Sequence, residues 1–172
     1  MAHAKLDQVR RRYDFRCAYC GVSETDVGSD LTVDHFQPTV GGGDESDDNL
    51  IYCCFKCNLY KGDFFPTPED LQMGRRLLHP LRDNSAAFFR QNMRSGQLEP
   101  VNETGRFHLQ LLQLNRPALV KFRLRRQLIS LLSEKQKLLE IENAHLQETL
   151  AAQEEYIAQL KALLGFPKDE ND

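Results

Sequence analysis

The chain of 172 residues contains no tryptophan. It also lacks any apolar run of the roughly 18 to 20 residues that a membrane-spanning helix requires. The N-terminal stretch is basic, but no apolar segment of the kind found in secretion signals follows it. These absences argue against a membrane or secreted protein, and we expect a protein of the reducing cytoplasm.

Cysteine is present in an odd number, at Cys17, Cys20, Cys53, Cys54 and Cys57. An odd count without a secretion signal disfavours a framework of disulfides. Four of the cysteines instead form two Cys-x-x-Cys pairs, Cys17 with Cys20 and Cys54 with Cys57. Two such turns supply the four thiolates that structural Zn²⁺ prefers. We therefore predict a zinc site, with Cys53 left as a small buried apolar side chain; the alternative is a set of buried thiols without a metal.

Positive charge is scarce in the C-terminal part of the chain. Residues 1–126 hold 18 Lys and Arg against 16 Asp and Glu, whereas residues 127–172 hold 4 against 9, and the net charge is -3. All of the arginines precede Gln127. This asymmetry fits a nucleic-acid-binding head on a solvated stalk, although a balance of +2 is also ordinary for a soluble domain.

Composition divides the chain into four segments and predicts an α+β fold. The boundaries place a metal-clasped core at 1–65, an associated extension at 66–119, a helix at 120–164 and an unstructured acidic end at 165–172.

The metal-clasped core reads as two short strands and a helix. Residues 31–33 form a β-branched run, residues 37–48 are rich in Gly and Asp, and residues 49–52 form a second apolar run before the helix that opens at Cys54. In the extension, weak alternation of apolar and polar residues predicts a further strand at 107–114.

The helix at 120–164 carries a heptad pattern. The two seam positions hold Ile129, Gln136, Asn143, Leu150, Ile157 and Leu164 at one and Leu132, Leu139, Leu146, Gln153 and Leu160 at the other. Eight of these eleven residues are Leu or Ile, which favours a coiled coil, and an Asn at a seam position is typical of parallel two-stranded pairs. We expect a homodimer through this helix; the alternative is a helix folded back on the head.

Between and beyond the cysteine pairs, the sequence resembles the HNH endonuclease family. The resemblance rests, besides the cysteines, on Asp34-His35, Pro38, Gly41-Gly42-Gly43, Asn49-Leu50, Asn58 and Lys61, and farther on upon Leu78-His79-Pro80, Gly105-Arg106 and the run from Leu112 to Pro117. It covers roughly Lys5 to Arg126 and leaves the heptad helix outside.

The resemblance implies a ββα-metal (His-Me finger) fold and a nuclease. His35 matches the general base, Asp34 a ligand of the catalytic Mg²⁺ or Mn²⁺, and Asn49 the residue that steadies the loop and the base. Asn58 stands where many members have a final His, so the site is an HNN variant in which an amide oxygen suits a hard cation. These residue types agree with the chemistry, because an imidazole titrating near pH 6.5 can take a proton from water.

The expected substrate is DNA, with RNA left open. Basic residues that could contact phosphate are Lys56, Lys61, Arg10, Arg11, Arg12 and Arg16. The bland reading is that these are solvated side chains, and two more arginines, Arg106 and Arg116, have less support. We expect structural roles for His79 and His108. Competing functions are a zinc-held binding module without catalysis and a coiled-coil adaptor.

Overall fold

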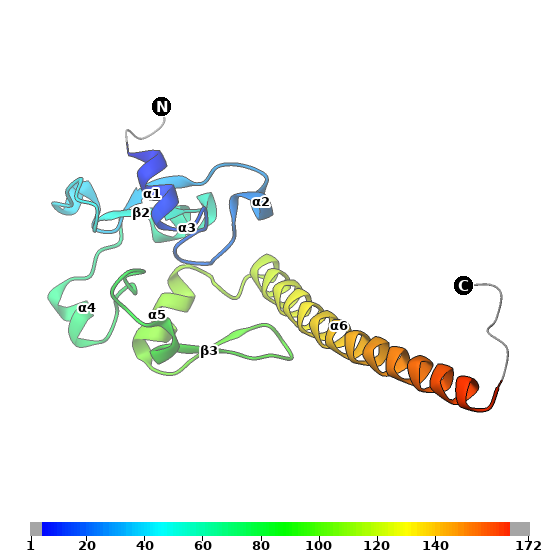
Figure 1. Cartoon of the computed structure of the whole chain (residues 1–172). Helices are drawn as coiled ribbons and strands as arrows, with labels where there is room; N and C mark the ends of the chain where they lie inside the picture. Colours follow the sequence, from blue (N-terminus) through cyan, green and yellow to red (C-terminus); the bar gives the residue numbers. More distant parts are fainter. Residues whose placement is uncertain (1–4, 166–172) are drawn as a thin grey trace. The chain divides into compact units, whose positions relative to one another are not determined.

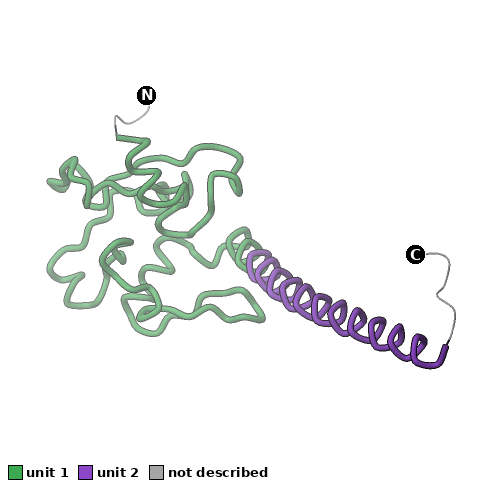
Figure 2. Tube along the Cα trace, in the orientation of Figure 1, with its two compact units in different colours: residues 1–124 green, residues 125–172 purple. Residues whose placement is uncertain are grey.

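The computed structural model describes residues 5–165 of the chain. Contacts between residues divide it into two compact units, which meet between Leu124 and Arg125 (Figure 2). The elements, in chain order (Figure 1), are α1 (Leu6–Arg12), α2 (Glu24–Val27), β1 (Thr32–His35), η1 (Thr39–Gly41), β2 (Leu50–Cys53), α3 (Phe55–Lys61), α4 (Pro68–Gln72), η2 (Ser85–Ala87), β3 (Phe89–Gln91), β4 (Leu98–Pro100), α5 (Glu103–Leu111) and α6 (Pro117–Leu163).

The centre of the first unit is an antiparallel hairpin of β1 and β2, in which Asp34 pairs with Ile51 and His35 with Leu50. All four residues of β2 are buried, because α1 packs on both strands and further apolar residues cover the other face. α3 follows β2 directly and packs against β1. The α+β class and the strand–loop–strand–helix order predicted from the sequence are confirmed.

The extension differs from its prediction in one element. Residues 103–111 form helix α5, so the strand expected at 107–114 is wrong. The side chain of Asn102 caps the helix by accepting a hydrogen bond from the Gly105 N–H at 2.8 Å. The buried positions are Gly105, His108, Leu109 and Leu112. Their three- and four-residue spacing is helical, and it outweighs the weaker two-residue alternation on which the strand was predicted.

A second hairpin, of β3 and β4, precedes α5 and packs on it. The side chain of Asn115 extends the edge of β4, because its amide accepts from the Leu98 N–H and donates to the Leu98 carbonyl, both at 2.8 Å. Pro117 then opens α6 at the first helical position, where a missing N–H costs nothing.

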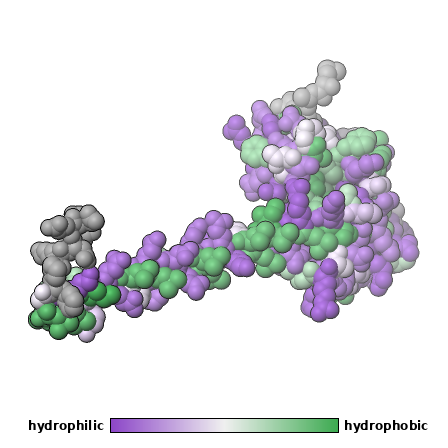
Figure 3. All heavy atoms as spheres, turned by 90° about the vertical axis from the view of Figure 1, so that its right-hand side faces the viewer, coloured by the Kyte–Doolittle hydropathy of each residue, from purple (hydrophilic) through white to green (hydrophobic). Residues whose placement is uncertain are grey.

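α6 spans 47 residues, and in its second-unit part apolar and polar side chains alternate along the helix (Figure 3). The seam residues Ile129 and Leu146 are more than half exposed within the single chain. The predicted helical segment is confirmed, while its pairing with a second copy is not tested by one chain. No described helix is long and apolar enough to cross a membrane. Most of the segment expected to be unstructured, from residue 166 onward, lies outside the described residues.

Candidate active site and metal centre

The two cysteine pairs converge into one cluster. The Sγ atoms of Cys17, Cys20, Cys54 and Cys57 all lie within 4.8 Å of one another, and those of Cys20 and Cys54 are 3.7 Å apart. Tetrahedral Zn²⁺ with Zn–S bonds of about 2.3 Å places its sulfurs about 3.8 Å apart, so the arrangement fits a structural zinc ion. It is the metal-ligand cluster found among the described residues.

Local backbone geometry presents the thiols. After the first pair, Gly21 adopts a left-handed conformation with φ 76°, and its N–H closes a tight turn on the Cys17 carbonyl at 2.8 Å. Cys54 is the residue before the first turn of α3, and Cys57 lies within that turn. Cys53 lies outside the cluster, fully buried, and burial raises the pKa of its thiol well above the ordinary range.

Arg116 joins the extension to this cluster. Its guanidinium nitrogen lies 3.9 Å from Cys54 Sγ and 3.8 Å from Cys57 Sγ, and it stacks over the ring of Tyr60 at 5.7 Å. A second nitrogen of the group donates to the Leu112 carbonyl at 3.1 Å. A four-thiolate zinc site carries two net negative charges, which an adjacent guanidinium offsets. Arg116 therefore lies against the metal cluster, where the sequence had suggested a phosphate contact.

Asp34 and His35 end strand β1 and point to opposite faces of the hairpin, as neighbours on a strand must. Asp34 is directed toward α3: its Oδ2 lies 3.0 Å from Nζ of Lys61, the buried last residue of that helix. This Oδ2 is buried yet makes no hydrogen bond of normal geometry, and burial raises the pKa of the carboxyl despite the ammonium group beside it.

Asn58 lies three residues before Lys61 on α3, so the two side chains share a face of the helix. A buried carboxylate oxygen without a proper donor, near a helix face that carries an amide, matches the oxygen ligands that Mg²⁺ and Mn²⁺ accept. Asp34 and Asn58 thus fit a divalent cation by their chemistry, and Lys61 supplies a fixed positive charge beside it.

Asn49 ties the two ends of the loop between the strands. Its Oδ1 accepts from the Gln37 N–H at 2.7 Å, and its Nδ2 donates to the carbonyls of Gln37 at 3.1 Å and of Asp44 at 2.8 Å. The Phe36 N–H also donates to the Asn49 carbonyl at 2.8 Å. These bonds fix the backbone immediately after His35 and so restrict where the imidazole can point.

Most of the basic residues singled out from the sequence have protein partners. Arg10 forms an ion pair with Glu24 at 2.6 Å, Arg12 one with Asp47 at 3.0 Å, and Lys61 the one with Asp34. Arg16 is half-buried and donates to the Gly21 carbonyl at 3.4 Å. Lys56 and Arg11 are exposed on α3 and α1. The arginines of α1 thus hold the surrounding loops in place.

The two histidines of the extension sit within packed surroundings. His79 contacts the Asp48 carbonyl at 2.9 Å and packs edge-on against Phe36. His108 is buried and its Nδ1 accepts from the Leu78 N–H at 3.1 Å; burial lowers its pKa to about 4. Both contacts are of the structural kind expected.

One contact had no signal in the sequence. Nε2 of His35 lies 2.9 Å from Oε1 of Glu45, a loop residue ten positions later. Acidic residues are common in such loops, and spacing alone does not say which of them reaches the imidazole.

A β-hairpin and a helix that bring an Asp–His pair together beside a four-cysteine cluster define the ββα class of metal-dependent nuclease domains. In agreement, residues 17–64 match the family model of the HNH endonuclease, and this segment is an HNH endonuclease domain. Neither the curated proteins nor the solved structures yielded a significant match to the chain.

Proposed function

We propose that the protein is a metal-dependent endonuclease that hydrolyses phosphodiester bonds of DNA. The observation that carries the proposal is the end of β1, where His35 faces a loop locked by Asn49 while Asp34 faces α3. A binding module without catalysis would not need these side chains together.

His35 acts as general base and takes a proton from water. The water oxygen then forms a bond to phosphorus, the bond to the 3′ oxygen breaks, and that oxygen is protonated by solvent, leaving 5′-phosphate and 3′-hydroxyl ends. Asp34 and Asn58 would hold the catalytic Mg²⁺ or Mn²⁺, which when bound stabilises charge on the phosphoryl and leaving oxygens. The four cysteines would hold structural Zn²⁺.

Contacts to the nucleic acid backbone are proposed for the exposed Lys56 and Arg11. Lys56 lies on α3, the helix that also carries Asn58, so its ammonium group is close in sequence to the catalytic face. Such contacts position the duplex without reading its sequence.

We also propose that α6 pairs with a second copy as a parallel coiled coil. Its seam leucines and isoleucines are exposed in the single chain, and burying each against a partner is favourable by roughly 1.5–3 kcal/mol. The resulting homodimer would carry two nuclease sites.

The nuclease proposal is tested by nicking of supercoiled plasmid in EDTA, Mg²⁺ and Mn²⁺. We expect activity that needs the divalent cation and falls by at least about 100-fold in His35→Ala, as loss of a general base does. His145→Ala, which removes an exposed histidine from α6, is the matched control and should cut like the wild type. A folded, zinc-loaded protein that nicks plasmid in no metal would contradict the proposal for duplex DNA.

A further inference from the structure

The contact between His35 and Glu45 joins the proposed base to a carboxylate. Nε2 of His35 and Oε1 of Glu45 are 2.9 Å apart; the imidazole is 22% exposed, whereas the carboxylate is 61% exposed. An exposed ion pair by itself contributes little to stability. Its interest lies in what it does to the ring.

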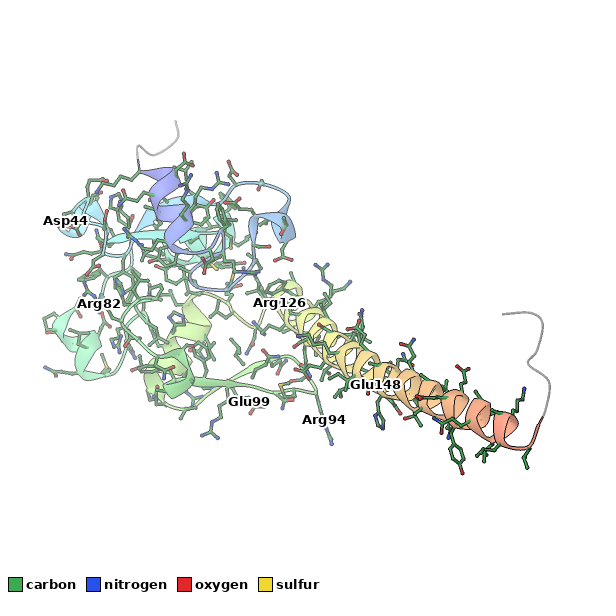
Figure 4. The ribbon with its side chains drawn as sticks, in the orientation of Figure 1. Asp44, Arg82, Arg94, Glu99, Arg126 and Glu148 are labelled. Atoms are coloured by element: carbon green, nitrogen blue, oxygen red, sulfur yellow. The ribbon has the colours of Figure 1, made fainter. Side chains whose placement is uncertain are left out.

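The loop holds Glu45 in place by bonds that do not involve His35. The Asp44 carbonyl accepts from Asn49 Nδ2 at 2.8 Å, and the carbonyl of Glu45 itself accepts from Lys5 Nζ at 2.7 Å. Asp44 also accepts from the backbone N–H and hydroxyl of Ser46 through its own carboxylate, which closes a tight turn around Glu45 (Asp44 is labelled in Figure 4).

Glycine allows the loop to fold this closely. A Cβ added at Gly43 would lie 1.8 Å from the carbonyl oxygen of Gln37, so only glycine fits there. The backbone on each side of Glu45 is therefore tied down, and the carboxylate is presented to His35 by the loop rather than captured by it.

We propose that Glu45 is a positioning residue for His35, an inference that rests on the proposed nuclease function. A carboxylate can only accept, so it fixes the proton of the neutral imidazole on Nε2 and leaves the lone pair on Nδ1. Nδ1 is then the atom that takes the proton from water. A carboxylate behind a catalytic histidine holds the ring and its tautomer in this way without itself being protonated.

The tautomer can be observed without any cleavage. Long-range ¹H–¹⁵N NMR spectra of zinc-loaded protein at pH 8.5, where an ordinary imidazole is neutral, report which nitrogen of His35 carries the proton. We expect the Nε2–H form in the wild type, a mixture of both forms in Glu45→Ala, and the Nε2–H form again in Glu45→Gln, whose amide oxygen still accepts.

Kinetics supply the second readout. We expect Glu45→Ala to lower kcat by about 10- to 100-fold, the usual cost of losing a partner behind a functional histidine, with KM changed less than about 2-fold. Glu45→Gln should recover most of the loss. Because the carboxylate is exposed, the unfolding midpoint should stay near that of the wild type. Glu69→Ala, on the exposed surface of α4, is the control.

The outcomes separate this inference from the function beneath it. A His35 tautomer that is the same in wild type and Glu45→Ala, or a parallel rise in KM at constant kcat, would overturn the positioning role even if the enzyme cuts DNA. A tautomer that depends on Glu45 in a protein that cleaves nothing supports the pairing and rejects the nuclease function instead.

Discussion

The two compact units of the chain treat their apolar side chains in opposite ways. In the first unit, Leu50 and Leu112 are fully buried, and the core runs from α1 to the first turns of α6. In the second, Leu139 and Leu146 are about half exposed. The first unit therefore stabilises itself, with help from a metal, whereas the second has apolar surface that only another molecule can cover.

This difference implies two separate dependences. Folding of the first unit should respond to zinc, because its small hairpin and helix are joined through the cysteine cluster. Folding of the second should respond to protein concentration, since a single helix gains little stability without a packed face. The predictions below test each dependence in turn.

The largest effect should come from removing a zinc ligand. We expect Cys57→Ser to lose the metal and to unfold the first unit, because structural zinc contributes on the order of 10 kcal/mol to such domains. Zinc content by mass spectrometry and thermal unfolding followed by tyrosine circular dichroism measure the two consequences. Helical signal from α6 should persist at the same protein concentration.

Cys53 provides the matched control for that experiment. It is fully buried next to a ligand but lies outside the cluster. Cys53→Ala should keep its zinc and cost no more than a buried cavity of one sulfur does. Near-native stability of zinc-free Cys57→Ser would refute the structural role of the metal.

A smaller effect, confined to the second unit, should follow from a charge in the heptad seam. We expect the wild type to have twice the 19.8 kDa chain mass by light scattering at tens of micromolar, and Leu146→Glu to be monomeric. The substitution removes one buried leucine per chain, about 1.5–3 kcal/mol each, and sets two carboxylates against each other.

Leu138 tests whether position in the heptad matters. It is more exposed than Leu146 and lies off the seam, so Leu138→Glu should leave the dimer intact. A monomeric wild type would reject the coiled coil and favour the alternative of a helix that folds back. In either case the zinc content of the first unit should not change.

Much of the first unit could be predicted because its signals are local. Each Cys-x-x-Cys turn brings its own two thiols together, and an Asp–His pair at the end of a short strand is evident from a few neighbouring residues. The four-cysteine cluster and the hairpin followed by α3 were predicted for this reason and are confirmed.

Pairings between distant residues could not be predicted in the same way. Lys61 and Arg116 read as surface cations in the sequence, yet one lies buried against Asp34 and the other against the thiols. Nothing in their neighbourhood specifies a partner 27 or 59 positions away. The roles of Asp34, His35, Asn49 and Asn58 remain predictions until cleavage is measured.

The smallest effect concerns pH and again separates the two units. His108 is buried in the first unit, and burial lowers its pKa from the ordinary 6.5 to about 4. Between these values the unfolded chain binds a proton that the folded protein does not. Stability is therefore greatest above pH 6.5 and falls as the pH drops toward 4, by about 3 kcal/mol in total from this residue.

Zinc thiolates also become protonated in acid, so the test compares two proteins rather than two pH values alone. In urea unfolding at pH 7, 5.5 and 4.5, we expect His108→Gln to lose less stability with falling pH than the wild type, because its amide oxygen still accepts from the Leu78 N–H but binds no proton. His145→Gln, at an exposed position on α6, should keep the wild-type slope. Equal slopes in His108→Gln and wild type would mean that the buried imidazole is not what makes the first unit sensitive to acid.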